Sequence, residues 1–388
     1  MDNSNRFESI DSTYRLLALC ARAAGHPVFY ERLANQVERF DAWHILPSQA
    51  ELHGMAPLLW HHVHTAGISL PAGVEQTLRG LHLRHRLFNH THLTVLKKIN
   101  ALFEQAGIRA VLLKGLALAL QYYPEPALRP VSDIDLLLER KDMPLAVNVL
   151  TDAGFFLYPP HASRTSDLLP SELKMDSPLT DGIRVQVELH TPSTRDHTYE
   201  EFKNLDAAHP LASVGNAIYI STPLNTLRYL SRHLRRHLFA ATEAKPLPLK
   251  WMADMVSLVE QNAEILDWAS LQRFDSVLLN QLEVFYNLTP LPAHLKVVIP
   301  LRQSSSPQGV NQYPCGWPQH SFSDWRHVGV FEFLRRTFSS PSEWWLRLYY
   351  GIGGGKMVWY GRIIYPLQII KRILLILLQR QFFTVQKP

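Results

Sequence analysis

The chain has 388 residues, of which 46% are hydrophobic and 19% are charged, and its formal net charge is +5. This composition is ordinary for a folded protein, and the length allows two or three domains. Ten lysines and arginines but only three acids lie from Ser321 onward, so this tail carries +7 and the rest of the chain −2. A nearly neutral body argues against nucleic acid as a specific partner.

The cysteines and the N-terminus bear on the compartment. Cys20 and Cys315 lie about 300 residues apart and near no metal-binding cluster, so neither a disulfide framework nor a cysteine zinc site is predicted. The N-terminal stretch MDNSNRFESIDSTYR is polar and lacks the apolar core of a signal peptide. We therefore expect a cytoplasmic protein.

Residues 1–107 are predicted to form an N-terminal helical region. Apolar residues recur at helical spacing in IDSTYRLLALCARA (10–23). A second, longer helical pattern runs from Gly73 and ends at Gly107. Its apolar stripe consists of Leu78, Leu81, Leu87, Leu93, Leu96, Ile99 and Leu102.

The period changes after Gly107, and residues 108–221 are predicted to form an α/β core. The segment 155–182 is rich in Pro, Ser and Asp and is predicted to be a loop. The fold class is therefore α+β, with a small mixed β-sheet core flanked by N- and C-terminal helical regions. The expected strands are IRAVLLK (108–114), SDIDLLL (132–138) and IRVQVELH (183–190), and the expected helices are GLALALQYY (115–123) and KDMPLAVNVLTDAG (141–154).

Helical patterns return in residues 222–300. The clearest are TPLNTLRYLSRHLRRHLF (222–239), which begins with Thr-Pro, and LKWMADMVSLVEQ (249–261). Residues 301–327 are predicted to be a linker. The last region, 328–388, is predicted to be a helical tail that is both apolar and basic.

Two aspartates interrupt the apolar strand SDIDLLL. Side chains at i and i+2 of a strand point to one side, so Asp133 and Asp135 project together, while Ile134 and Leu136 face the opposite layer. Glu188 lies on the polar face of another predicted strand. If the two strands are neighbours, three carboxylates converge, and their mutual repulsion calls for a counter-charge. Hard cations prefer oxygen ligands, so we expect one or two Mg²⁺ ions, or Mn²⁺, held by these three side chains.

The end of the preceding strand carries a second chemical signal, Lys114 followed by Gly115. Gly115 permits a tight turn from strand to helix and a close backbone approach to a ligand. The helix that begins there offers free N–H groups to a phosphate, and Lys114 adds a positive charge at the same place. A strand, a glycine turn, an Asp-x-Asp strand and a later acidic strand together form a constellation for phosphoryl transfer.

The ordered motifs GIRAVLLKGLAL, YP, an arginine and SDIDLLL resemble the uncharacterised nucleotidyltransferase family, part of the DNA polymerase beta-like nucleotidyltransferase superfamily. The resemblance continues in VQVELH, in the His-bearing LRYLSRHLRRH and in LKWMADMVSL, and it covers roughly residues 10–270. This family is often associated with polysaccharide and peptide biosynthesis clusters. The resemblance implies a Mg²⁺-dependent transferase that takes a nucleoside triphosphate.

The resemblance also assigns roles to single residues. Asp133 and Asp135 match the metal-binding pair, and Glu188 matches the third carboxylate. Gly115 stands where the superfamily has a Gly-Ser phosphate turn. Here Leu116 follows the glycine instead of Ser, and seventeen residues separate Gly115 from Asp133, more than the usual superfamily spacing.

Three further polar residues are candidates for contact with nucleotide or phosphate. Arg129, just before the carboxylate strand, would neutralise phosphate or, equally, fix an aspartate structurally. His190 shares the face of Glu188 and would orient it or contact substrate. His237 lies on a helix expected to face the cleft, near ligand phosphates. Lys250 and Asp254, four residues apart, are expected to form an ordinary surface pair, although the resemblance raises interest in Asp254.

The stretch 344–383 is aromatic-rich and basic, and three placements are open for it. Its longest unbroken apolar run, ILLILL (373–378), falls short of the roughly 18–20 residues of a membrane span. An interfacial helix would place Lys/Arg and Trp/Tyr at the headgroup level, peripherally at the inner membrane face. The alternatives are a terminal helix packed on the protein or on a partner, and a true span.

The leading functional hypothesis is the transfer of a nucleoside monophosphate from a triphosphate, most simply ATP, to an acceptor that the sequence does not identify. Two rivals stay open. One is a kinase or phosphotransferase on the same fold, and the other is a non-catalytic assembly protein of a membrane-associated glycan pathway, with the tail as its functional part.

Overall fold

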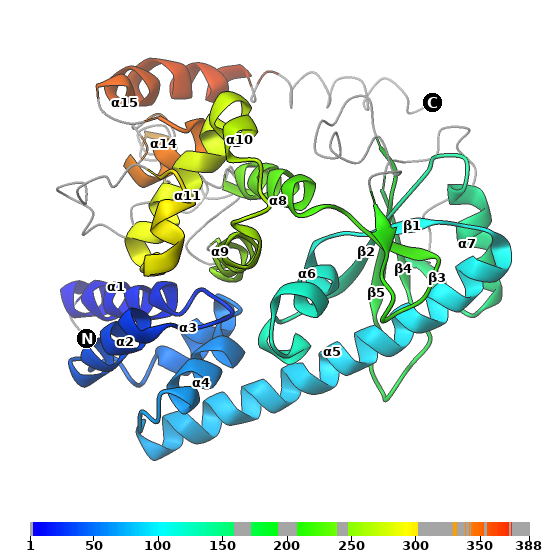
Figure 1. The fold of residues 1–388 in the computed structure, drawn as a ribbon, viewed down its shortest axis with the longest axis horizontal. Helices are drawn as coiled ribbons and strands as arrows, with labels where there is room; N and C mark the ends of the chain where they lie inside the picture. Colours follow the sequence, from blue (N-terminus) through cyan, green and yellow to red (C-terminus); the bar gives the residue numbers. More distant parts are fainter. Residues whose placement is uncertain are drawn as a thin grey trace.

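The computed structural model describes residues 3–158, 172–192, 208–238, 247–301, 329–331, 338, 341, 343–352, 355–371 and 374. Within these ranges the architecture is a mixed sheet at one end of a larger assembly of helices (Figure 1). The α+β class expected from the sequence is confirmed. The expected linker 301–327 and the run ILLILL fall almost entirely outside the described residues.

The N-terminal helical region ends in one long helix that reaches the sheet. This helix, α5, ends where Gly107 adopts a left-handed conformation with φ of 69°, as predicted, because glycine takes this conformation without steric cost. Figure 1 shows α5 running from the small N-terminal helices to the strands. The helices of this region are α1 (Asn3–Leu19), α2 (Pro27–Glu38), α3 (Leu46–Leu52), α4 (Ala56–Thr65) and α5 (Ala72–Ala106).

The described strands form one seven-stranded sheet in the order β3-β4-β5-β2-β1-β7-β6. At its centre, β2 pairs antiparallel with β1 and parallel with β5, so the two acidic strands are neighbours. The helices α6 (Lys114–Tyr122) and α7 (Met143–Asp152) lie before and after β2 in the chain. The strands are β1 (Ala110–Leu112), β2 (Asp133–Leu138), β3 (Phe156–Tyr158), β4 (Glu172–Asp176), β5 (Gln186–His190), β6 (His209–Pro210) and β7 (Ile218–Ile220).

The prediction of a loop over 155–182 was wrong at both of its described ends, which contain β3 and β4, while 159–171 lie outside the described residues. These strands are short, and β4, ELKMD, has only one fully buried residue, Met175. Its alternation of Leu173 and Met175 with polar residues spans only five positions, which is too short to stand out among the surrounding Ser, Pro and Asp. Strand β4 also supplies Lys174 to the site.

A second set of helices follows the sheet. The helices predicted over 222–239 and 249–261 are present as α8 and α9, within one or two residues at each end. The described helices from here on are α8 (Pro223–Leu238), α9 (Lys250–Asn262), α10 (Trp268–Phe274), α11 (Ser276–Leu288), the 3-10 turn η4 (Ala293–Val297), α14 (Glu343–Tyr350), α15 (Lys356–Trp359) and the π-helical η6 (Tyr360–Ile364).

Two buried apolar clusters lie on opposite sides of β2. Ile134 and Leu136 join a cluster between the sheet and helices α5 and α7. Leu137 faces the other way and joins the cluster that holds the helices together. The predicted alternation is therefore confirmed, and the face that carries the aspartates is the face turned toward the helical part of the chain.

Candidate active site

The site begins with a row of side chains across three strands. Asp135 on β2 and Glu188 on β5 are direct partners in the parallel register. Glu188 is in turn the direct partner of Lys174 on β4. Because direct partners in neighbouring strands point to the same face, Lys174, Glu188 and Asp135 form a continuous polar row on an otherwise apolar sheet.

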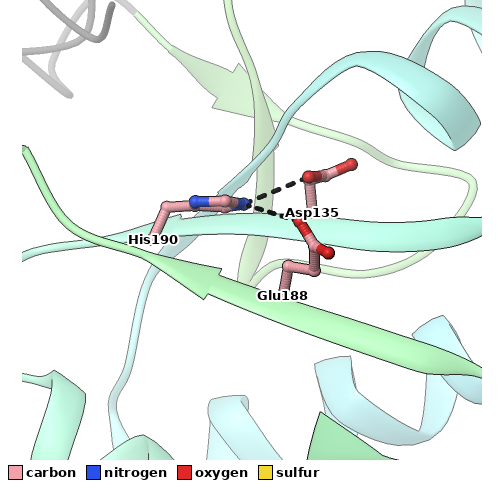
Figure 2. A group of neighbouring side chains, drawn as sticks. All are labelled: Asp135, Glu188 and His190. Atoms are coloured by element: carbon pink, nitrogen blue, oxygen red, sulfur yellow. Dashed lines mark hydrogen bonds and ion pairs between the residues drawn. The ribbon is translucent and has the colours of Figure 1, made fainter. Parts of the chain in front are cut away.

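Asp135, Glu188 and His190 form a compact buried cluster (Figure 2). His190 Nε2 donates to Asp135 Oδ1 at 3.1 Å and lies 3.6 Å from Glu188 Oε2. Ligand atoms of the three side chains all lie within 4.8 Å of one another. Asp135 Oδ2 is buried and has no hydrogen-bond partner, which is costly unless a cation binds there. Two carboxylates and an unsatisfied buried oxygen fit a divalent metal ion.

Lys114 closes the row from the end of β1. Its Nζ lies 3.1 Å from Asp135 Oδ1 and 3.8 Å from Asp133 Oδ2. Burial opposes the charged ammonium, but Asp135 and Asp133 outweigh this effect and raise the pKa of Lys114. Burial likewise raises the pKa of Asp135, yet Lys114 and the His190 hydrogen bond outweigh it and lower this pKa to about 2. Asp135 is therefore ionised throughout the physiological range.

Lys174 was missed by the sequence reading. It lies in the segment taken for a loop, and it pairs with Glu188 across β4 and β5. Burial raises the pKa of Glu188, Lys174 offsets part of this effect, and the negative charge of Asp135 adds to the rise. The two carboxylates of the row therefore differ: Asp135 is held ionised, whereas Glu188 is closer to accepting a proton. Such a difference between neighbouring acids is typical of acid–base sites.

Asp133 lies apart from the compact cluster. It is the first residue of β2, its side chain is half-buried, and it accepts a hydrogen bond from Ser132 at 3.0 Å. Residues i and i+2 of a strand are separated by about 6.6 Å, so Asp133 sits one pleat nearer the solvent than Asp135. Lys114 contacts both aspartates and is the group that joins them. The role of Asp133 as a metal ligand stays a prediction.

Gly115 has the unusual backbone conformation expected of a tight turn from strand to helix. Its φ of 40° and ψ of −109° are not helical, so α6 is kinked at its second residue. A Cβ atom placed there would meet its nearest neighbour, the Asp133 carbonyl oxygen, at 3.7 Å, which is an ordinary contact. The position therefore requires glycine for its backbone angles and not for space. This turn places Lys114 beside the carboxylates.

Arg129 and Asp254 form a buried ion pair that the sequence did not predict. Arg129 donates from Nε to Oδ1 at 3.1 Å and from Nη2 to Oδ2 at 2.8 Å, and Tyr123 donates to Oδ1 at 2.8 Å. Asp254 is fully buried, so the expected surface pair between Asp254 and Lys250 was wrong. Of the two roles expected for Arg129, this geometry favours the structural one.

The segment that leads into β2 is also fixed from the other side. Asn89 on α5 donates its side-chain N–H to the Arg129 carbonyl oxygen at 2.8 Å and accepts from the Val131 N–H at 3.2 Å. Arg129 itself is held by α9 through Asp254. Two helices from different parts of the chain thus determine where the strand with the aspartates begins.

Lys250 approaches the site from the first turn of α9. Its Nζ lies 3.5 Å from the Pro130 carbonyl oxygen, and its stem passes directly over Gly54. Burial lowers the pKa of Lys250 to about 8, the Arg129 guanidinium adds to this shift, and Asp254 and Asp133 oppose it. Lys250, expected from the sequence to be a surface residue, is therefore the third lysine near the carboxylates, after Lys114 and Lys174.

The histidines of α8 lie close to this group without joining the cluster. The rings of His233 and His237 are 4.5 Å apart, and both contact the Trp251 ring, at 4.8 and 5.0 Å. Burial lowers the pKa of His233 well below its usual value, with a further contribution from Lys114. His233 is thus within electrostatic range of Lys114 and Asp135, while a cleft beside this helix and contact between His237 and a phosphate stay predictions.

The comparisons with known proteins agree with this arrangement. A family model described as uncharacterised nucleotidyltransferase matches residues 41–289, which include α3 to α11 and every described strand. No curated protein matches the chain. The matched range contains the whole polar row, the Gly115 turn and the Arg129–Asp254 pair. The chain therefore belongs to the family of uncharacterised nucleotidyltransferases.

Proposed function

We propose that the protein is a metal-dependent nucleotidyltransferase that moves a nucleoside monophosphate from a nucleoside triphosphate to an acceptor hydroxyl. The observation that carries the proposal is the row of Lys174, Glu188 and Asp135, which ends at Lys114 and the Gly115 turn. In the reaction, a bond forms between the acceptor oxygen and the α-phosphorus while the bond from that phosphorus to pyrophosphate breaks.

The metal would be Mg²⁺ or Mn²⁺, because the donors are chiefly carboxylate oxygens. Asp135 and Glu188 would hold it, with Asp133 adding oxygens from the solvent side. A bound divalent cation would neutralise charge on the phosphates. His190 already donates to Asp135 Oδ1, and the buried Oδ2, which has no hydrogen-bond partner among the described residues, would bind the cation. We therefore assign His190 to orienting Asp135.

The side chains around the cluster divide the remaining tasks. Glu188 would accept the proton of the acceptor hydroxyl, and its raised pKa suits that role. Lys114 would bind phosphate oxygens once a divalent cation takes over the neutralisation of the aspartates. The turn at Gly115 would present backbone N–H groups to the triphosphate, although Leu116 supplies no hydroxyl there. ATP is the simplest donor to test first.

Metal binding provides a test that needs no acceptor. Mn²⁺ titrated into the protein and followed by electron paramagnetic resonance should bind to wild type, and the Asp135→Asn and Glu188→Gln variants should bind at least tenfold more weakly. Glu139→Gln is the matched control, since Glu139 follows the same strand but pairs with Lys141 outside the cluster. Equal binding by wild type and both cluster variants would refute the metal site.

Isotope position then identifies the transferred group. The protein is incubated with an extract of its source cells and ATP labelled at either the α- or the γ-phosphate. Label in the product from α-labelled ATP, lost in Glu188→Gln, supports nucleotidyl transfer. Label from γ-labelled ATP would instead indicate a kinase, and no transfer with either label would favour the assembly role. Fractionating the product into glycan, lipid and protein tests the expected link to polysaccharide synthesis.

A further inference from the structure

The C-terminal helical stretch packs on the protein with only one of its faces. This stretch comprises α15, η6 and helical residues 365–371, with residue 374 also helical. Gly361, Tyr365 and Ile369 are buried. The Tyr365 ring meets Trp345 of α14 edge-on at 5.2 Å, and Tyr350 donates to Gln368 Oε1 at 2.8 Å. These contacts fix which face of the stretch is turned away from the protein.

The outward face is apolar, although it has no partner among the described residues. Its large side chains recur at intervals of three or four residues, as expected for one side of a helix. They are between 38% and 57% exposed, and a contiguous exposed apolar row marks an interaction surface, whereas single exposed apolar residues do not. The apolar stripe consists of Trp359, Ile363, Leu367, Ile370 and Leu374.

The charges around the apolar stripe are all positive. Lys356, Arg362 and Lys371 are exposed along the same stretch. From residue 344 to the end of the sequence there is no Asp or Glu, while seven Lys and Arg residues occur. A second copy of the chain would bring like charges together at this surface, so the charge pattern disfavours self-association and favours an anionic partner.

We propose that the apolar stripe and its basic residues form a docking surface for an anionic lipid bilayer. Apolar side chains would enter the boundary between headgroups and acyl chains, Trp359 would lie at headgroup depth, and the basic residues would contact acidic headgroups. Among the described residues no helix is long and apolar enough to cross a membrane, which fits a helix that lies on the surface. This inference does not depend on the reaction proposed above.

Vesicle binding by the full-length protein tests the proposal. Wild type should sediment with vesicles of phosphatidylcholine and phosphatidylglycerol, and only weakly with phosphatidylcholine alone. The double variant Leu367→Ser/Ile370→Ser should bind at least tenfold more weakly. A matched control is Ile265→Ser/Val297→Ser, which removes two apolar side chains that are also exposed but lie far from the stretch in sequence. This control should bind like wild type.

The charge contribution is measured separately. Each basic residue near an anionic surface is worth about 1 kcal/mol, or about fivefold in affinity. Arg362→Gln/Lys371→Gln should therefore bind anionic vesicles more than tenfold more weakly, and added salt should reduce the difference. All substituted side chains are exposed, so the melting temperatures should match wild type, and sedimentation velocity without lipid should give the same monomer mass for each.

Three results would overturn the proposal. The first is equal vesicle binding by wild type and the Leu367→Ser/Ile370→Ser variant. The second is binding that does not distinguish anionic from neutral vesicles. The third is a lipid-free dimer that Leu367→Ser/Ile370→Ser dissociates, which would identify a second copy of the chain as the occupant of this surface.

Discussion

Arg129 and Asp254 are 125 positions apart in the chain, and the guanidinium of one donates to both carboxylate oxygens of the other in a fully buried pair. The pair connects α9 to the segment that enters β2. Asp254 therefore acts on the site indirectly. Through Arg129 it helps to fix the position at which the strand that carries Asp133 and Asp135 begins. The approach of Lys250 to Pro130 follows from the same docking of α9.

Removing one partner of this pair should be more harmful than removing both. Asp254→Leu leaves the Arg129 guanidinium buried without its counter-charge, and we expect a loss of about 3–5 kcal/mol in the free energy of unfolding. Arg129→Met/Asp254→Leu should recover most of this loss, because no unpaired charge is then left inside. Urea denaturation of the two variants measures the difference. Equal losses would mean that the pair is not the dominant interaction at this position.

Lys114 should have opposite effects on metal and nucleotide. Its ammonium neutralises Asp135 and Asp133 and would repel a divalent cation bound to the same oxygens. Lys114→Met should therefore bind Mn²⁺ at least tenfold more tightly while nucleotide binding weakens about tenfold. Calorimetric titration with Mn²⁺ and then with a non-hydrolysable ATP analogue measures both. Lys141→Met, which removes an exposed lysine paired with Glu139, is the control and should change neither.

Gly115 should be intolerant of substitution for a conformational reason. Gly115→Ala places a Cβ at a positive φ, and we expect a cost of about 1–3 kcal/mol in the free energy of unfolding. Gly80→Ala is the matched control: Gly80 lies inside α5 with no atom near the added Cβ, and the substitution should stabilise by up to about 1 kcal/mol. Thermal unfolding of both variants measures the contrast. A neutral Gly115→Ala would show that the turn relaxes without cost.

Two buried histidines should make the helical part of the chain sensitive to acid. Burial lowers the pKa of His53 to about 4 and that of His62 to about 3. Because these values lie below the unfolded value near 6.5, the stability is fully present above pH 6.5 and is lost as the pH falls toward the folded values. Between pH 7 and pH 5 each histidine should cost about 2 kcal/mol. Urea denaturation at the two pH values measures this loss.

A variant checks that assignment. His62 Nε2 donates a hydrogen bond to the Arg22 carbonyl oxygen at 2.8 Å, and its ring packs edge-on against the Phe29 ring. His62→Gln keeps a group that donates to this oxygen and removes the titration. The variant should lose about 2 kcal/mol less than wild type between pH 7 and pH 5. An unchanged slope would assign the acid sensitivity to other groups.

Much of the polar row could be predicted because its components are local. The alternation in SDIDLLL and VQVELH determines which side chains share a face, since strand side chains alternate with a period of two. The pairing of Asp135 with Glu188 agrees with the prediction that the acidic strands are neighbours. By contrast, the alternation in β4 spans only five residues between segments rich in Ser, Pro and Asp, and nothing in the local sequence indicates that Lys174 lies opposite Glu188.

The sequence alone therefore determined the local conformations and the chemistry that they offer: the end of α5 at Gly107, the turn at Gly115 and the facing of the aspartates. Tertiary structure decided which polar groups lose contact with water and which cations they meet. Burial and ion pairing depend on contacts between distant segments, as between Arg129 and Asp254. Contacts between distant segments also determine that His190 lies in the cluster and that Asp133 lies at its edge. They bring Lys250, expected at the surface, to the border of the site.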